Sequence, residues 1–275
     1  MNNQLQNKPK FSLAIQSEGY KRLINNTLGD PKRAAKFIAA ISSAVATNSS
    51  LQQCDAGSIL SGALLGEALN LSPSPQLGQY YLVPFKDKAQ FQLGYKGYIQ
   101  LAIRSGQYKD IDVIEVREGE YLGRDKITGK HQFEFIEDEV ERENKPIIGY
   151  MAYFEYLNGF YKNLYWSKEK MQKHALEYSQ AYASDVKKGT NYSFWTKDFN
   201  GMAFKTMLRQ LISKWGIMSI DMQEALTKDM SVVKEDGTYD YVDNQPVMEV
   251  PIEERVEQTA ETTTVEVKQV NINEL

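Results

Sequence analysis

The sequence predicts an α+β fold, in which an antiparallel β-sheet and hairpins pack with several α-helices around one core. Two helical patterns in the first 70 residues and a group of β-rich runs near the middle are typical of this class. The strand runs are joined by short links such as Asn158-Gly159, which favour antiparallel pairing because parallel strands need long crossovers. With 275 residues, 42% of them hydrophobic, the chain is long enough to bury a sizeable core.

The first elements are an arm and two helices. Residues 1–15 are polar and lack a period, so we expect an unstructured arm. Asp30 and Pro31 predict a helix start, and a second helix is predicted from Asp55 until the prolines near residue 74. The apolar residues that repeat at helical spacing in the first of these helices are Ala34, Phe37, Ile38, Ile41 and Val45.

Two β-rich runs follow, and they predict a hairpin with Lys86-Asp87-Lys88 at its tip. Residues 96–104 then suit a short helix, which the pair Ser105-Gly106 ends. Further strands are predicted within residues 110–120, 131–137 and 147–166.

The last third of the sequence is predicted to be helical. Ser167 suits the cap of a helix that carries Met171, Ala175, Tyr178 and Tyr182, and residues 184–193 read as a polar loop. A long helix is expected over residues 196–215, with a further turn or two over residues 222–226.

The charge distribution divides the chain. From Asp229 onward there are 12 acidic and 3 basic residues, whereas residues 1–228 contain 24 acidic and 29 basic residues. We therefore expect a flexible arm at 1–15, a cationic core at 16–228 and an acidic, disordered tail at 229–275. This pattern suits a polyanion-binding domain with a separate interaction segment, and it equally suits a solvated surface with a solubilising tail.

Composition and motifs disfavour several classes of protein. The single cysteine, Cys54, excludes an intramolecular disulfide, and with only His131 and His174 the usual zinc sites and hydrolytic triads are not expected. No P-loop or dinucleotide-binding motif is present. No apolar run reaches the roughly 20 residues of a membrane-spanning helix, and the start lacks a secretory signal, so we expect a cytoplasmic protein.

Carboxylates in the middle of the chain keep a nuclease open as an alternative. A two-metal nuclease would require Glu115, Glu118, Glu120 or Asp125 to converge. Acidic residues on strands and turns are more often simply solvated, so no metal site is expected.

Two segments carry the candidate binding residues. In the predicted helix 196–215, Lys205 and Arg209 are four residues apart beside an apolar face. They would either bind phosphate groups together or simply face solvent on the outer side of the helix. In residues 91–109, Lys96 and Arg104 share a polar stripe, and Tyr95 and Tyr98 offer rings for stacking or for core packing. Gly94 and Gly97 would let an anion approach the backbone there. The remaining cations predicted to contact a nucleic acid are Lys86, Lys88, Lys109, Lys187, Lys188, Lys197 and Lys214.

The segments "FQLGYKGYIQLAIRSGQYKDIDVIEVREGE" and "MAFKTMLRQLISKWGIMSIDMQ" closely resemble the RecT family of phage and prophage single-strand annealing proteins, and the resemblance extends more weakly over residues 30–229. It implies ATP-independent annealing of complementary DNA strands in recombination, with neither catalysis nor a cofactor. It also implies homo-oligomeric rings or helical filaments whose α+β core is distantly similar to Red-beta and Rad52.

The resemblance also implies which residues and partners take part. Gly94, Tyr95, Lys96, Gly97 and Arg104, with Lys205, Thr206 and Arg209, would lie along a groove that holds the DNA backbone. Many relatives carry two lysines where this chain has Phe204-Lys205, so either the groove has one cation fewer or Phe204 contacts the strand. The implied partners are single-stranded DNA, the annealed duplex intermediate, a host single-stranded DNA-binding protein and a phage exonuclease, in the cytoplasm of a bacterial host.

Annealing requires that phosphates are neutralised while base edges stay free to pair, so contacts should be to backbone and ring faces. A passive single-strand binder would have similar residues and remains a second alternative. The helix that carries Lys32, Arg33 and Lys36 supplies either a subunit contact or a second basic strip.

Overall fold

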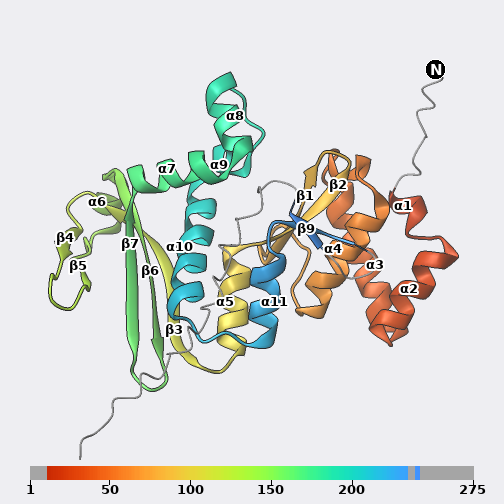
Figure 1. Cartoon of the computed structure of the whole chain (residues 1–275), viewed down its shortest axis with the longest axis horizontal. Helices are drawn as coiled ribbons and strands as arrows, with labels where there is room; N and C mark the ends of the chain where they lie inside the picture. Colours follow the sequence, from red (N-terminus) through yellow and green to blue (C-terminus); the bar gives the residue numbers. More distant parts are fainter. Residues whose placement is uncertain (1–10, 235–238, 242–275) are drawn as a thin grey trace, which may run out of the picture. The chain divides into compact units, whose positions relative to one another are not determined.

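The computed structural model describes residues 11–234 and 239–241, and Figure 1 shows the order of their helices and strands. The helices combine with antiparallel sheets, which confirms the predicted α+β class. In the described residues, no helix has both the length and the apolar character needed to cross a membrane.

The N-terminal part is helical: α1 (Phe11–Ala14), α2 (Glu18–Leu28), α3 (Pro31–Ala46), the 3-10 turn η1 (Leu51–Gln53) and α4 (Ala56–Ala68). Helices α3 and α4 were predicted, and Asp30 caps α3 by accepting from the backbone N–H of Lys32. The start of the chain differs from the prediction. Phe11 and Ile15 are buried in the core, so residues 11–15 belong to the folded part, and residues 1–10 lie outside the described residues.

The first sheet has the order β1-β2-β8-β9, and its core is the predicted hairpin of β1 (Tyr80–Phe85) and β2 (Lys88–Leu93). Phe85 pairs with Lys88, so Lys86-Asp87 forms a two-residue turn. Helix α4 packs on β2, where Ala89, Phe91 and Leu93 are buried. The apolar pattern of these strands therefore reflects contact with the N-terminal helices.

The second sheet has the order β3-β6-β7, with β3 (Tyr108–Arg117), β6 (Ile147–Tyr156) and β7 (Tyr161–Ser167). The predicted Asn158-Gly159 link joins β6 to β7, and Gly159 has a positive φ of 83°. The separate pair β4 (Tyr121–Arg124) and β5 (His131–Phe133) and the short helix α6 (Glu139–Asn144) lie between β3 and β6 in the sequence, and neither β4 nor α6 was predicted.

The remaining helices are α5 (Tyr95–Arg104), α7 (Lys168–Tyr178), α8 (Gln180–Lys188), α9 (Phe194–Lys197), α10 (Phe199–Trp215) and α11 (Ile220–Lys228). Helix α10 packs on β6 and α5, and it lies beside both in Figure 1. Three predictions need correction here. The helix expected to carry Met171, Ala175, Tyr178 and Tyr182 is two helices, because Ser179 is extended and caps the start of α8, which contains Tyr182. The expected loop 184–193 is helical as far as Lys188, and the helix expected at 196–215 is interrupted at Asp198, whose side chain caps α10.

The folded core continues past residue 228. Asp229 is buried, and β8 (Ser231–Val233) pairs with β2 at Phe91 and Ser231, followed by β9 (Tyr239–Tyr241). The predicted boundary between core and tail at Asp229 is therefore wrong, because this aspartate is part of the core. Most of the expected tail, residues 242–275, lies outside the described residues.

Candidate nucleic-acid interface

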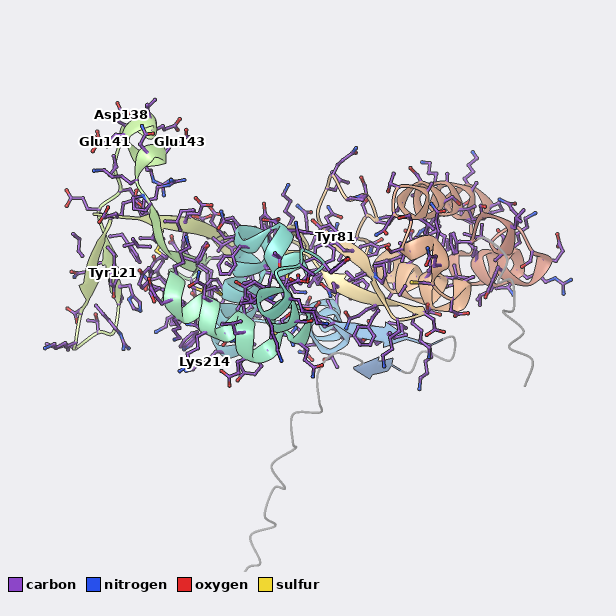
Figure 2. All side chains as sticks on the ribbon, turned by 90° about the horizontal axis from the view of Figure 1, so that it is seen from above. Tyr81, Tyr121, Asp138, Glu141, Glu143 and Lys214 are labelled. Carbon is purple, nitrogen blue, oxygen red and sulfur yellow. The ribbon has the colours of Figure 1, made fainter. Side chains whose placement is uncertain are left out.

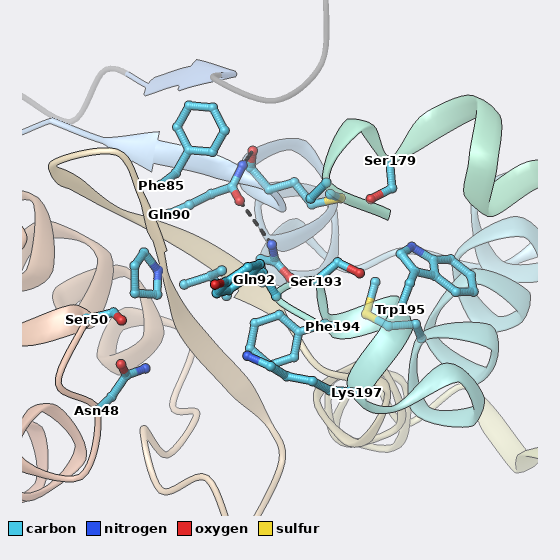
Figure 3. A pocket seen from close by; sticks show the side chains of 16 residues that line it. Asn48, Ser50, Phe85, Gln90, Gln92, Ser179, Ser193, Phe194, Trp195 and Lys197 are labelled. Atoms are coloured by element: carbon cyan, nitrogen blue, oxygen red, sulfur yellow. Dashed lines mark hydrogen bonds between the residues drawn. The ribbon is translucent and has the colours of Figure 1, made fainter. Parts of the chain in front are cut away.

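Two adjoining cavities form a groove between the N-terminal helices, the β1–β2 hairpin and α9. One measures about 320 Å³ and the other about 530 Å³, and they share the lining residues Asn48, Ser50, Phe194 and Lys197. Figure 3 shows the first cavity, with Asn48 and Ser50 on one side and Phe194 and Lys197 across from them. We call these two cavities the groove.

The floor of the groove is built from neutral hydrogen-bonding groups. Gln90 and Gln92 on β2 line the first cavity, and the Gln92 amide donates to the Gln90 Oε1 over 3.0 Å, as the dashed line in Figure 3 indicates. Gln90 also donates to the carbonyl oxygen of Met230. Because these amides bond to protein, they fix the shape of the floor.

Aromatic rings line the groove beside cations. Tyr81 and Phe194 lie with ring centroids 6.1 Å apart, and Phe85 lines the first cavity just before the hairpin turn. The Lys197 ammonium lies 5.9 Å from the Phe194 ring centroid, and the Lys86 ammonium lies 5.5 Å from that of Phe85. The groove therefore has a ring beside a cation at two places, on α9 and at the tip of the hairpin.

Four predicted cations lie at or near the groove. Lys197 lines both cavities, whereas Lys86, Lys88 and Lys96 lie next to lining residues: Lys86 follows Phe85, Lys88 pairs with Phe85 across the hairpin, and Lys96 lies near Tyr81. All four are exposed, and no ion pair engages them in the part of the chain that the structure describes. The Lys96 side chain lies near Tyr81, which lines the second cavity. Both side chains reach Gly78: a Cβ added to this glycine would lie 3.4 Å from the Lys96 Cδ and 3.0 Å from the Tyr81 hydroxyl. These ammonium groups are free to meet an anion.

Three other predicted residues meet at a buried carboxylate. Asp229 accepts from the Lys205 ammonium at 2.9 Å, the Arg209 guanidinium at 2.8 Å and the Tyr98 hydroxyl at 3.1 Å. It also accepts from the backbone N–H of Leu93 at 2.9 Å. We call this group the Asp229 cluster.

The Asp229 cluster corrects the expected position of Lys205. Lys205 is only 5% exposed, so it does not project from the surface of α10, whereas Arg209 keeps part of its side chain accessible. Burial lowers the pKa of the Lys205 ammonium, and Asp229 opposes this shift. Burial first, and then the charge of Asp229, raise the pKa of the Tyr98 hydroxyl. In the described fold, Lys205 and Tyr98 act together as a structural unit.

The glycines that open α5 serve chain packing. A Cβ on Gly97 would lie 2.1 Å from the carbonyl oxygen of Gln79, and one on Gly94 would lie 2.1 Å from that of Gly78. The backbone of residues 78–79 therefore packs directly against these two glycines. It fills the space in which an anion was expected to bind.

Other predicted residues are engaged elsewhere. The Arg104 guanidinium donates to the carbonyl oxygens of Leu69 and Asn70 at 3.0 and 2.8 Å, at the end of α4. Thr206 is buried and donates to the carbonyl oxygen of Met202, one turn earlier in α10. The Lys109 ammonium pairs with Glu155 at 2.6 Å, which raises the pKa of Lys109.

The last cations lie at the ends of helices. Lys187 and Lys188 occupy the last turn of α8, and Lys214 lies near the end of α10, with its ammonium 4.8 Å from the Trp215 ring centroid. All three are exposed. Phe204 is half-buried, packing edge-to-face against Tyr95 at 5.5 Å between centroids, which supports its assignment to the core face.

A buried aspartate holds the α9 wall of the groove in place. Asp185 accepts from the hydroxyls of Thr190 and Thr196 at 2.6 and 2.7 Å, and from the backbone N–H of Ser193 at 2.7 Å. The Thr190 hydroxyl, together with these other donors, holds the pKa of Asp185 well below its usual range. The ionised carboxylate of Asp185 therefore holds the turn that leads into Phe194.

Three of the four carboxylates considered for a nuclease are engaged by protein groups, and the fourth, Glu118, is exposed. Glu120 pairs with Arg142 at 2.6 Å, and Glu115 accepts from Arg117 and Asn200. Asp125 accepts from Thr128 within its own turn. Among the residues with described positions, no group of three or more histidine, cysteine or acidic side chains could hold a metal ion.

Sequence reasoning missed most of the groove lining. Asn48, Gln90, Gln92 and Phe194 were not singled out, although "YSFW" before Lys197 is a run of aromatic residues next to a cation. That run was the available signal.

The comparisons with known proteins agree with the resemblance. The model of the RecT family matches residues 35–245. The chain is similar to the uncharacterized protein YqaK of Bacillus subtilis (strain 168), with 42% identity over 77% of this chain and 68% of that protein. It is also similar to Protein RecT of Escherichia coli (strain K12), with 30% identity over 65% of this chain and 65% of that protein. The chain thus spans about two thirds of the length of these relatives.

Proposed function

This chain belongs to the RecT family, whose members have a single-strand annealing role in DNA recombination; from that premise we propose that it anneals complementary DNA strands without ATP and without catalysis. The groove is the proposed seat of the DNA backbone. The observation that carries the proposal is the group of exposed, unpaired cations beside half-buried rings: Lys86, Lys88, Lys96 and Lys197 next to Phe85, Tyr81 and Phe194.

The chemistry of the groove suits a strand whose bases must stay free. Lysine ammonium groups neutralise phosphates without reading sequence, and each neutralised phosphate releases a counterion. Ring faces stack on any base, at about 1–3 kcal/mol per base. The amides of Gln90 and Gln92 bond to protein groups, so these two groups of the groove floor do not compete for the base edges that must pair with the second strand.

The proposed groove differs from the one implied by the resemblance. Lys205, Tyr98 and Gly97 support it from beneath through the Asp229 cluster and the packing of α5, whereas Lys197 and the hairpin lysines take the contacts with phosphate. Arg209, at 39% side-chain exposure, is the member of the cluster that can also reach a strand. Single-stranded DNA, the annealed duplex and further copies of the chain are the proposed partners, in the cytoplasm of a bacterial cell. The single-stranded DNA-binding protein and the exonuclease remain predictions.

The test is the rate of pairing of two complementary labelled oligonucleotides in EDTA without ATP. Faster pairing with intact oligonucleotides supports the proposal, shortened products indicate a nuclease, and binding without faster pairing indicates a passive binder.

Groove variants locate the activity. Lys86→Ala plus Lys197→Ala should lower the salt dependence of binding by about 0.7 per lost phosphate contact. Phe194→Ala should weaken binding by about 1–3 kcal/mol and leave the salt slope unchanged, because it removes stacking only. Lys109→Ala is the control, since this lysine already pairs with Glu155. Unchanged binding in the first two variants would refute the groove assignment.

A further inference from the structure

A separate group of side chains lies at the opposite end of α10 from the groove. Helix α10 has 17 residues, so it is about 25 Å long. Lys197 of the groove comes directly before the Asp198 cap at the start of this helix, whereas Lys214 and Trp215 lie at its end. In the view of Figure 2, Lys214 lies well apart from Tyr81, which lines the groove. The surface around Trp215 is therefore distinct from the groove.

Two lysines share the ring of Trp215. The Lys162 ammonium, from β7, lies 4.7 Å from the ring centroid, and the Lys214 ammonium lies 4.8 Å from it. Among the described residues, no ion pair engages either lysine. Attraction to the ring thus holds two like charges close together, and an anion that met both ammonium groups would relieve their repulsion.

The segments that carry these lysines contain no acidic residue to compensate them. Lys162 is the only charged residue in 157–167, and Lys214 is the only charged residue in 210–220. The next charged residue, Asp221, lies in the first turn of α11. Within the two segments the charge is therefore positive only.

Acidic residues of the same sheet lie on its other face. The Tyr156 hydroxyl donates to the Trp215 carbonyl oxygen at 2.9 Å, and side chains alternate along a strand, so the preceding Glu155 points away from Trp215. Glu155 pairs with Lys109 at 2.6 Å, and Asp110 is its register partner on β3. These carboxylates therefore do not neutralise the two lysines.

Exposed apolar side chains adjoin the shared ring. Phe160 is 47% exposed and stacks on Tyr156 with 5.7 Å between ring centroids, and Ile217 is 45% exposed. Apolar side chains that stay exposed together are typical of protein-binding surfaces. We call this surface the Trp215 site, and its residues are Phe160, Lys162, Lys214, Trp215 and Ile217.

The Trp215 site is held in one conformation. The backbone N–H of Ile217 donates to the Tyr156 hydroxyl, and the carbonyl oxygen of Ile217 accepts from the Tyr108 hydroxyl at 3.0 Å. Two tyrosines of the second sheet thus fix the chain just after α10. A rigid surface loses little conformational entropy on binding, which favours its use as a contact.

We propose that the Trp215 site binds an acidic peptide segment of a partner protein. Carboxylates of the segment meet Lys162 and Lys214, and one of its apolar side chains packs on Phe160 and Ile217. A nucleic acid strand fits less well, because it carries a phosphate at every nucleotide, whereas this site offers two cations and an apolar surface. The proposal assigns Lys214, which was predicted to contact DNA, to protein binding, and it does not rely on strand annealing.

Peptide selection identifies what the Trp215 site binds. A phage library of random peptides of about 12 residues is panned on the full chain. The library is first depleted on the site-reversed variant, Lys162→Glu plus Lys214→Glu, which keeps the groove lysines and therefore removes peptides that bind in the groove. The selected peptides should be enriched in Asp and Glu next to Phe, Leu or Trp, relative to the unselected library.

Fluorescence anisotropy then measures the affinity of one labelled selected peptide. The site-reversed variant should bind it at least about tenfold more weakly, because like charges then meet. Phe160→Ala should weaken binding without changing its salt dependence, since only the apolar contact is lost. The control is Lys126→Glu plus Lys130→Glu, which makes the same change of net charge at exposed residues between β4 and β5 and should bind the peptide like the wild type.

Far-UV circular dichroism verifies that all variants are folded. A selection that enriches no acidic peptides, or a site-reversed variant that binds the peptide as tightly as the wild type, would overturn the proposal. If the site-reversed variant instead loses oligonucleotide binding or assembly while it still binds the peptide, a nucleic acid or a second copy occupies the site and the proposal is wrong. A wild type that binds the peptide but does not accelerate strand pairing would refute only the proposed function.

Discussion

The Asp229 cluster gives the sharpest test of how the predicted DNA-binding residues are used. The perturbation is Asp229→Ala, which removes the carboxylate that accepts from Lys205, Arg209, Tyr98 and the Leu93 N–H. The side chain of Lys205 is 7% exposed, so its ammonium would be left charged and nearly without water. Removing one partner of a buried ion pair costs about 3–5 kcal/mol.

That cost is a large part of the roughly 5–15 kcal/mol that stabilises a typical domain. The stranded Tyr98 hydroxyl and Leu93 N–H add to it, although contributions within one network do not sum. We therefore expect a loss of at least about 3 kcal/mol in the free energy of unfolding.

The assay is urea unfolding followed by far-UV circular dichroism at fixed protein concentration, with Asp221→Ala as the exposed control. The control should change stability by less than about 0.5 kcal/mol. In the double variant Lys205→Met plus Asp229→Ala the stranded charge is gone, so part of the stability should return. A loss below about 1 kcal/mol in Asp229→Ala would refute the reasoning, since Lys205 would then not depend on Asp229.

Three further predictions concern the supports of the groove. Gly97→Ala should destabilise the fold by about 1–3 kcal/mol or more in urea unfolding, because the added Cβ would lie 2.1 Å from the Gln79 carbonyl oxygen. The control is Gly19→Ala, which should be neutral or slightly stabilising because the space around Gly19 is open. Arg104→Ala should lower the free energy of unfolding by about 1–2 kcal/mol, because its guanidinium donates hydrogen bonds to the carbonyl oxygens at the end of α4. The salt dependence of DNA binding should stay the same, and a weaker salt dependence would instead show that Arg104 contacts the DNA. The lowered pKa of Asp185 means that its contribution to stability is present above the carboxyl's unfolded pKa of about 3.9 and is lost as the pH falls below it. The urea midpoint of Asp185→Asn should therefore change less than that of the wild type between pH 5 and pH 3, and equal changes would contradict this role.

Local patterns in the sequence determined much of the fold. The cap at Asp30, the hairpin with its tip at Lys86-Asp87-Lys88 and the Asn158-Gly159 link each depend on a few adjacent residues. The cap and the link appear in the structure as predicted, and the hairpin differs only in that Lys88 already belongs to β2. Helix α6 and strand β4 were missed because they are short and lack a periodic apolar face. The family was also readable from sequence, since two long segments carry its motifs.

The tertiary structure alone decided which cations are available. Spacing on α10 placed Lys205 and Arg209 side by side, but it contained no information about Asp229, which reaches them from the far end of α11. The count of charged residues assigned Asp229 to a disordered tail, whereas the structure shows that its carboxylate is buried in the core. The physical reason is that the environment of a charge depends on groups distant in sequence, so an identical lysine is a buried ion-pair partner at 205 and an exposed, unpaired cation at 197.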